Sequence, residues 1–366
     1  MKKRILSVFG TRPEAIKMAP LVKEISGRAD LEGLVCISGQ HKEMLEQVMT
    51  CFNIHADYDL AIMKQNQTLY DITCNVIREM EKVLSAAKPD VVLVHGDTTT
   101  SYAAAVAAFY RQIPVGHVEA GLRTYNLNSP FPEEFNRQSI GLIAKYHFAP
   151  TAWAKQNLIN ERKNPSDVYV TGNTVIDALH MTVEKDFMHP LLDFTGNDRL
   201  ILVTAHRREN LGAKMEEMFQ AILRIATDFH DVKVVFPIHK NPAVREIADR
   251  IFSDCSKIKL CEPLNPFDFH NIMNRAYIVL TDSGGLQEEA PAFGVPVFVM
   301  RDTTERPEAI SAGTAKLVGT EAETIYREVS RVLDDASEYQ KMSLAQNPFG
   351  DGRAAVRITD ILMNRL

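Results

Sequence analysis

Short apolar runs alternate with longer segments of helical periodicity along almost the whole chain. In the first half, the runs have the length and composition of buried strands, and the segments between them place apolar residues three and four positions apart. The predicted strands are residues 5–9, 34–38, 91–94, 115–118 and 146–149, and the predicted helices are residues 13–26, 67–86 and 101–111. This alternation is typical of a parallel sheet with helices on both faces.

The same alternation starts again near residue 200. It predicts strands at 200–204, 233–237, 257–261, 277–281, 295–299 and 316–318, with helices at 214–229 and 285–293 among them. A chain of 366 residues also exceeds the size of one ordinary hydrophobic core. We therefore expect an α/β fold of two Rossmann-like domains, each a doubly wound parallel sheet, facing a central cleft. The expected domains are 1–170 and 171–352, with a last helix, 353–366, packing back on the first.

Composition narrows the class of protein. The net charge of −6 argues against a general nucleic-acid binder, which would carry a basic surface. No apolar run approaches the length of a membrane span, and the run behind the basic start is too short for a signal peptide. The five cysteines include no Cys-x-x-Cys pair, which fits reduced, mostly buried thiols. We expect a cytoplasmic protein without nucleic-acid or membrane partners.

Acidic residues stand in loops where predicted strands of the first half end. Asp97 and Glu119 each follow an apolar run, and Glu133 lies in a loop a little further along the chain. Loops beyond the carboxyl ends of parallel strands line the ligand crevice of such folds. Several acids converging there predict proton transfer to and from a substrate.

Each acid also has a structural interpretation. Asp97 could cap the helix that starts near Ser101, and Glu119 could form an ion pair with Arg123. Glu133 and Glu134 could form a solvated turn or pair with Arg137. We favour the catalytic interpretation, because it needs only one cause for the three positions.

Two segments have the features of anion-binding turns at helix starts. Thr11 is a suitable N-cap after the first strand, and Arg12 and Lys17 add positive charge to the amino end of that helix. In the second half, Ser283-Gly284-Gly285 lets backbone N–H groups approach a phosphate closely. Arg306 follows the next strand. These features favour a nucleotide diphosphate over a simple capped turn.

His206 immediately follows the first strand of the second half, where it could move protons or donate to a leaving phosphate. The nearest match to a dinucleotide fingerprint, residues 350–355, follows no strand, and there is no Walker loop. No His or Cys spacing resembles a zinc site. We therefore expect neither a nicotinamide cofactor nor a metal.

Six segments resemble the non-hydrolysing UDP-N-acetylglucosamine 2-epimerases. They are GTRPEAIK (10–17), HGDT (95–98), HVEAGLR (117–123), PEE (132–134), TAHRREN (204–210) and DSGG (282–285). The resemblance implies the glycosyltransferase-B arrangement of two Rossmann-like domains in a homodimer. It also implies reversible epimerisation of UDP-GlcNAc to UDP-ManNAc, through loss of UDP to 2-acetamidoglucal and its re-addition. The product would feed cell-surface polysaccharide synthesis, and the reaction would need no cofactor.

The resemblance also implies roles for individual residues. Asp97, Glu119 and Glu133 match the catalytic acids, and His206 matches a histidine near the pyrophosphate. The matches to nucleotide contacts are Arg12, Lys17, Ser283, Gly284, Gly285 and Arg306, with Glu289 at the ribose and Phe269 at the uracil. A second, activating UDP-GlcNAc would lie against Gln40, His41, Glu134, Arg207 and His239. Glu43 and Asn66 depart from the commoner pattern of that pocket, where a glutamine is frequent at the first position and an arginine can occur at the second. Both changes would weaken pyrophosphate binding.

Three other functions share parts of this pattern. A glycosyltransferase would use the same fold and UDP site, but it would need an acceptor site and fewer acids. A hydrolysing epimerase would let water capture the glucal and would release free ManNAc. A non-catalytic nucleotide-sugar sensor would not need the complete set of acids.

Overall fold

The computed structural model describes residues 2–39, 42–64 and 67–366, apart from the side chains of residues 42–44 and 208. The chain forms two compact units. Unit 1 comprises Met1–Met181 and Phe349–Leu366, and unit 2 comprises Thr182–Pro348. Each unit contains one parallel sheet, so the predicted fold class of two doubly wound α/β domains is confirmed.

The sheet of unit 1 has seven strands in the order β3-β2-β1-β4-β5-β6-β7. The strands are β1 (Lys3–Phe9), β2 (Leu31–Ile37), β3 (Tyr58–Asp59), β4 (Val91–His95), β5 (Val115–Val118), β6 (Tyr146–Ala149) and β7 (Val168–Val170). The helices are α1 (Arg12–Ser26), α2 (Lys42–Cys51), α3 (Leu69–Ala87), α4 (Thr99–Tyr110), α5 (Glu133–Ile143), α6 (Ala152–Asn160), α7 (Thr174–Thr182) and α16 (Ala354–Arg365).

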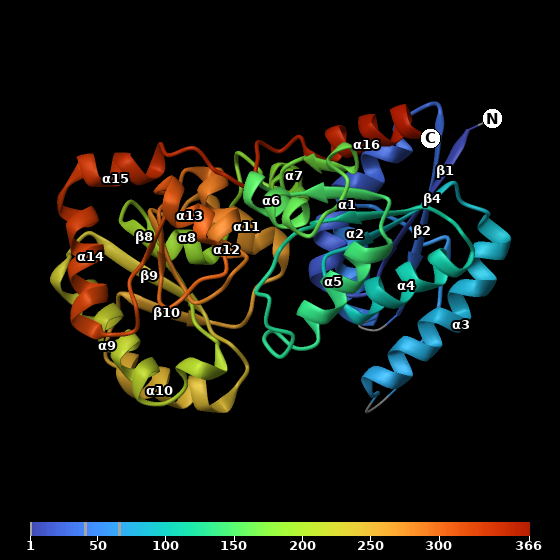
Figure 1. The fold of residues 1–366 in the computed structure, drawn as a ribbon. Helices are drawn as coiled ribbons and strands as arrows, with labels where there is room; N and C mark the ends of the chain where they lie inside the picture. Colours follow the sequence, from blue (N-terminus) through green and yellow to red (C-terminus); the bar gives the residue numbers. More distant parts are fainter. Residues whose placement is uncertain (1, 40–41, 65–66) are drawn as a thin grey trace. The chain divides into compact units, whose positions relative to one another are not determined.

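Helices cover both faces of this sheet because its strands are apolar on both sides. In β1, Ile5 and Phe9 pack with α1, α2 and α16, whereas Leu6 and Val8 pack with α3 and α4 on the other face. This division follows from the two-residue period of a strand. Figure 1 shows α16 lying beside α1, although the two helices come from opposite ends of the chain.

The sheet of unit 2 has six strands in the order β10-β9-β8-β11-β12-β13. The strands are β8 (Arg199–Thr204), β9 (Val232–Pro237), β10 (Ile258–Cys261), β11 (Ile278–Thr281), β12 (Val297–Val299) and β13 (Ala315–Leu317). The longer helices are α9 (Ala213–Asp228), α10 (Pro242–Phe252), α11 (Pro266–Asn274) and α14 (Ala322–Asp334), and the shorter ones are α8 (Pro190–Thr195), α12 (Leu286–Glu289), α13 (Pro307–Ala312) and α15 (Ala336–Ser343). One large core joins β8 and β9 to α9, α10 and α14.

The structure corrects several details. The predicted helix 285–293 is broken into α12 and a 3₁₀ turn, Ala290–Phe293, which has Pro291 in its first turn. The predicted boundary at residue 170 precedes α7, whereas the structure keeps α7 in unit 1 through Met181. The reason is local, because the Asp177 carboxylate accepts the backbone N–H groups that begin α16.

The expectation of mostly buried thiols is wrong. Only Cys36 is buried, while Cys51 and Cys74 are exposed and Cys255 and Cys261 are partly exposed. Throughout the described part of the chain, every helix is too short or too polar to cross a bilayer.

Candidate active site

Four carboxylates gather at the carboxyl end of the unit 1 sheet, and we call this group the acidic edge. Asp97 follows β4, Glu119 follows β5, and Glu133 and Glu134 begin α5. Because β4 and β5 are neighbours with His95 opposite Val118, Asp97 and Glu119 leave the sheet next to each other. The three acids predicted to be catalytic thus share one electrostatic environment, and the charges of Glu119 and Glu133 both raise the pKa of Asp97.

Asp97 contacts side chains of α5 and does not cap a helix. Its carboxylate forms an ion pair with Arg137, and its backbone carbonyl accepts a hydrogen bond from the Asn136 amide at 2.9 Å. The N-cap of α4 is Thr98, so the capping interpretation of Asp97 is excluded. Burial raises the pKa of Asp97, and the positive charge of Arg137 opposes that rise.

Glu119 adopts a backbone conformation that is rare for a residue with a side chain. Its φ of 61° lies in the left-handed region, which costs free energy and is often found at functional sites. Its carboxylate pairs with Lys17 and accepts a hydrogen bond from Asn173 at 2.8 Å. The suggested partner Arg123 instead forms a two-pronged ion pair with Glu161, at 2.6 and 3.0 Å.

Three buried histidines lie on neighbouring strands of the same sheet. They are His95 on β4, His117 on β5 and His147 on β6. Burial lowers the pKa of His95 to about 4, that of His117 to about 3 and that of His147 to about 4. His95 Nε2 lies 3.7 Å from a Glu119 oxygen, so a neutral imidazole ring borders the acidic edge.

The start of α1 confirms the predicted N-cap and reveals a second use for Glu14. The Thr11 side chain caps the helix in a capping box with Glu14. The buried Glu14 carboxylate also accepts hydrogen bonds from the Thr98 and Ser101 hydroxyls, at 2.7 and 2.8 Å. Glu14 therefore ties the start of α1 to the start of α4. Partial burial at this helix start lowers the pKa of Arg12.

In unit 2, the segment Asp282–Gly285, which we call the Ser283 turn, follows β11. Its neighbour β8 places Thr204 opposite Thr281, and the two hydroxyls are hydrogen-bonded at 2.7 Å. The Asp282 side chain is fully buried. It accepts the backbone N–H groups of His206 and Arg207, at 2.9 and 2.8 Å. Asp282 thereby fixes the loop after β8 against the Ser283 turn.

The same carboxylate orients the His206 ring. His206 Nδ1 lies 3.3 Å from Asp282 Oδ1, while 41% of the His206 side chain is exposed. The ring stacks on His239, with 5.7 Å between centroids. Partial burial lowers the pKa of His206, and the Asp282 charge opposes that effect. The histidine is held by one nitrogen, and its exposure gives solutes access to the ring.

Cations surround the Ser283 turn. Arg306 donates to Glu288 at 2.6 Å, and Glu305 pairs with Arg301 at 2.7 Å and with Arg207 at 3.7 Å. The pKa of Glu305 is lowered because Arg306 and Arg301 outweigh the effect of burial. A Cβ on Gly284 would meet Glu305 and Arg306 only at ordinary contact distances of 3.5 and 3.7 Å. The Gly284 backbone therefore lies close to both the Arg306 guanidinium and the Glu305 carboxylate. Backbone N–H groups beside an arginine can bind an anion.

The predicted residues are thus divided between the two units. Arg12, Lys17 and the acidic edge belong to unit 1, whereas His206, Arg207, His239, the Ser283 turn, Glu289, Arg306 and Phe269 belong to unit 2. Glu289 reaches back to Gly285, and Phe269 lies on α11. Gln40, His41, Asn66 and the Glu43 side chain lie outside the described residues. Within the described part, no three His, Cys, Asp or Glu residues are grouped as a metal site.

Sequence reasoning did not single out Glu14, Arg137, Asp282 and Glu305 as organising residues. Asp282 carried a signal, because it is the first residue after a strand and immediately precedes the Ser283 turn. Arg137 was visible only as a partner for Glu133 or Glu134. Its contact with Asp97 spans 40 residues of sequence, and no periodicity predicts such a contact.

Comparison with known proteins adds independent findings. The model of the family "UDP-N-acetylglucosamine 2-epimerase" matches residues 23–363. A Bacillus subtilis UDP-N-acetylglucosamine 2-epimerase is 56% identical, over 99% of this chain and 96% of that protein. The crystal structure of a putative UDP-N-acetylglucosamine 2-epimerase from Listeria monocytogenes has a TM-score of 0.96, and its sequence is 53% identical, over 100% of this chain and 97% of that chain. A Neisseria meningitidis UDP-GlcNAc 2-epimerase bound to UDP-GlcNAc is 47% identical with a TM-score of 0.89, over 99% and 100%.

Proposed function

Because this chain belongs to the UDP-N-acetylglucosamine 2-epimerase family, we propose that it interconverts UDP-GlcNAc and UDP-ManNAc by inverting C2 of the sugar. The observation that carries this proposal is the acidic edge. Asp97, Glu119 and Glu133 come from three separate segments and meet at the carboxyl end of one sheet. Inversion at carbon needs a proton acceptor on one face and a proton donor on the other, and a group of carboxyls can supply both.

We propose an elimination followed by an addition. A carboxylate of the acidic edge removes the C2 proton while the C1–O bond to UDP breaks. The electron pair of the C–H bond becomes the C1=C2 double bond of 2-acetamidoglucal, and the C1–O pair leaves with UDP. UDP then adds back to C1 as a carboxyl group protonates the opposite face of C2. Atoms and electrons balance without an oxidant, so the proposal calls on no nicotinamide.

The proposed roles of individual residues are those that the family resemblance implies. The Ser283 turn offers backbone N–H groups to the pyrophosphate, and Arg306 and His206 stabilise the charge that develops on UDP. Glu289 accepts hydrogen bonds from the ribose, and Phe269 lies against the uracil. Arg12 and Lys17 contribute positive charge from unit 1. The cations around the Ser283 turn and the orientation of His206 by Asp282 support this assignment.

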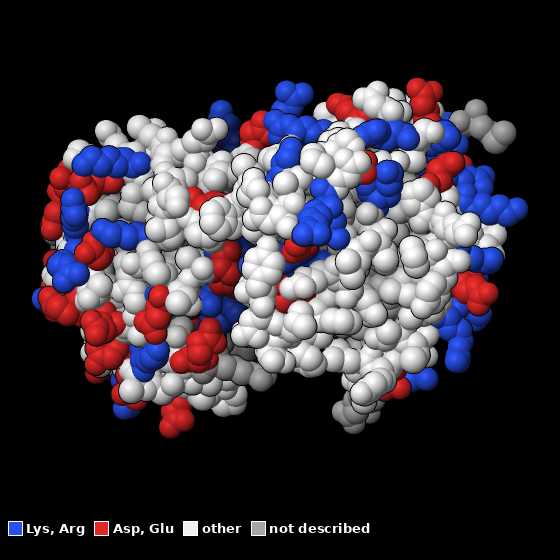
Figure 2. Space-filling model, in the orientation of Figure 1, with Lys and Arg blue, Asp and Glu red and all other residues white. Residues whose placement is uncertain are grey.

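Further features are proposals that rest on family membership. They are a cytoplasmic location, a homodimer, supply of a surface polysaccharide, and an activating UDP-GlcNAc site that includes Arg207 and His239. Exposed apolar side chains on α4 and α5 support the homodimer, since large exposed apolar patches commonly mark interfaces. They are Phe109, Tyr110, Phe135 and Leu142. Figure 2 shows a broad area with few charged side chains over these helices.

Proton NMR of the purified protein with UDP-GlcNAc in D₂O, without added cofactor, tests the function. We expect deuterium at C2 in a mixture of UDP-GlcNAc and UDP-ManNAc, because the carboxyl protons exchange with solvent. Free N-acetylmannosamine with UDP would instead identify a hydrolysing epimerase. An unchanged spectrum, with UDP binding confirmed separately, would refute the epimerase and favour a transferase or a sensor.

A further inference from the structure

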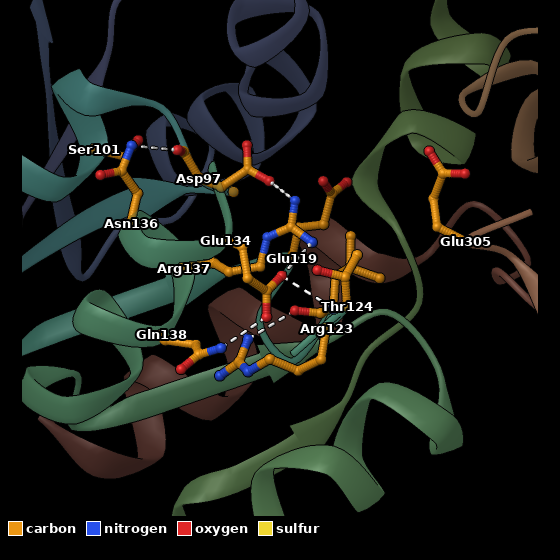
Figure 3. A network of polar contacts seen from close by, with 12 residues as sticks. Asp97, Ser101, Glu119, Arg123, Thr124, Glu134, Asn136, Arg137, Gln138 and Glu305 are labelled. Carbon is orange, nitrogen blue, oxygen red and sulfur yellow. Dashed lines mark hydrogen bonds and ion pairs between the residues drawn. The ribbon is translucent and has the colours of Figure 1, made fainter. Parts of the chain in front are cut away.

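The first turns of α5 carry a chain of charged contacts that ends on Asp97. Figure 3 shows the Arg137 side chain between the carboxylates of Asp97 and Glu134. Arg137 Nη2 pairs with Asp97 Oδ2, and Nη1 lies 3.3 Å from Glu134 Oε2. Only 11% of the Arg137 side chain is exposed. An arginine suits this place because its planar fork presents several N–H donors in a fixed geometry and can address two carboxylates at once.

The Glu134 side chain forms hydrogen bonds and an ion pair inside unit 1. Its side chain is fully buried. Its two oxygens accept the backbone N–H groups of Thr124 and Tyr125, each at 3.0 Å, and the Gln138 amide at 2.8 Å. Burial would raise the pKa of Glu134, but these hydrogen bonds and the Arg137 charge outweigh it and lower the pKa. Glu134 therefore presents a fixed negative charge to Arg137.

This carboxylate also stabilises a strained loop. Tyr125 has a φ of 58°, in the left-handed region that side chains disfavour. The Glu134 hydrogen bonds hold Thr124 and Tyr125 in that conformation and connect the loop to α5. Asn136 adds a second link from α5, through its hydrogen bond to the Asp97 carbonyl. Asp97 is thus held by both its side chain and its backbone.

We propose that Arg137 is a positioning residue for Asp97 and that Glu134 in turn fixes Arg137. Arg137 acts through Asp97 by setting the direction of its carboxylate and the charge beside it. The proposal deepens the function proposed above and rests on it. It also gives Glu134 a structural task inside unit 1, in place of the contact with an activating nucleotide that the family resemblance implies.

The charge of Arg137 should affect the pH dependence of the reaction rate. The charged groups that face Asp97 are Arg137 and Glu133 on α5 and Glu119 after β5. Arg137 is the cation among them, and it favours the ionised carboxylate. Its removal would raise the pKa of Asp97. The limb of the pH–rate profile that reports Asp97 must then move to higher pH, whether the reaction needs this group ionised or protonated.

The test compares Arg137→Met and Arg137→Lys with a matched control, Arg28→Met. Arg28 also bridges two carboxylates of unit 1, Glu24 and Asp360, at 2.7 and 2.8 Å, but it does so near the end of α1. We expect Arg137→Met to lower kcat by about tenfold to a hundredfold, as a misplaced catalytic group does, and to move the Asp97 limb upward. Its affinity for UDP, measured by calorimetry, should stay at the wild-type value. Arg137→Lys should keep the limb near its wild-type position and lose less activity, and Arg28→Met should behave as wild type.

Glu134→Gln provides a second test that keeps Arg137 in place. We expect a smaller loss of kcat, because Arg137 loses one of its two carboxylate partners, and an unchanged dependence of rate on UDP-GlcNAc concentration. A changed concentration dependence with an unmoved pH profile would overturn the proposal and place Glu134 in an activator site. Wild-type kinetics for Arg137→Met, unmoved limbs, or a parallel loss of UDP affinity would also overturn it. Absence of C2 exchange in the wild-type protein would instead refute the proposed function itself.

Discussion

The acidic edge of unit 1 and the Ser283 turn of unit 2 occupy equivalent places in their sheets, but they treat charge differently. In unit 1, Asp97 and Glu119 are largely buried and matched by Arg137 and Lys17. In unit 2, the fully buried charge is Asp282, which holds backbone N–H groups, while His206 and Arg207 remain partly exposed. One edge thus has carboxylates held by cations, and the other has partly exposed cations. This difference fits the roles proposed above, proton transfer for the acidic edge and anion binding for the Ser283 turn.

Asp97→Asn should have the largest effect on the acidic edge and none on the Ser283 turn. We expect it to lower kcat by about a hundredfold to ten-thousandfold, the usual range for loss of a general acid or base. UDP affinity should stay at the wild-type value, because Asp97 belongs to the acidic edge and not to the Ser283 turn. C2 deuterium exchange and calorimetry with UDP measure the two effects. Asp360→Asn, a surface change in the same unit, serves as control, and normal turnover in Asp97→Asn would disprove the catalytic assignment.

Low pH should lower the free energy of unfolding of unit 1, because three of its histidines are buried. Their folded-state pKa values of about 4, 3 and 4 lie below the ordinary 6.5. The unfolded chain therefore binds more protons as pH falls below 6.5, and each histidine costs about 1.4 kcal/mol per pH unit until its folded-state pKa is reached. Hydrogen exchange as a function of pH should show β4, β5 and β6 losing protection before β8 and β11. His147→Gln should flatten this dependence and the exposed His55→Gln should not; equal slopes in both would contradict the prediction.

Asp282→Asn tests the corresponding role of the buried carboxylate in unit 2. Asparagine would present an N–H group where the carboxylate accepts two backbone N–H groups, which leaves buried polar groups without partners. We expect a loss of about 1–3 kcal/mol in the stability of unit 2, together with weaker UDP binding as His206 loses its orientation. Thermal unfolding and UDP titration measure both. Asp302→Asn is the control, since 63% of the Asp302 side chain is exposed, and an unaffected Asp282→Asn would show that the loop after β8 does not depend on this carboxylate.

The smallest expected effect is that of Gly284→Ala. The added Cβ would make only ordinary contacts with Glu305 and Arg306, so stability should not change. If a phosphate packs against this backbone, the methyl group should weaken UDP binding by about tenfold, equal to about 1.4 kcal/mol. Calorimetry with UDP checks this, with Gly27→Ala at the end of α1 as control. Unchanged affinity would show that the phosphates of UDP do not pack against the Ser283 turn.

Sequence alone predicted the sheets well but not the network around the acids. Buried strands such as β1 and β4 are continuous apolar runs, and the structure confirms them with small changes at their ends. β3 and β7, with two and three residues, are too short to produce a periodic signal. Asp97 and Glu119 were identifiable because they follow strands. The partner of Asp97 was not, because α5 brings Arg137 to it only after the chain has folded.

The position of α16 has a consequence for synthesis of the protein. The amino-terminal part of unit 1 is translated before unit 2, whereas α16, which packs on the apolar face of α1 and is anchored by Asp177, is translated after unit 2. Part of the unit 1 core therefore stays exposed while unit 2 is synthesised. Unit 2 can fold as an uninterrupted segment, whereas unit 1 is completed only after α16 has been made.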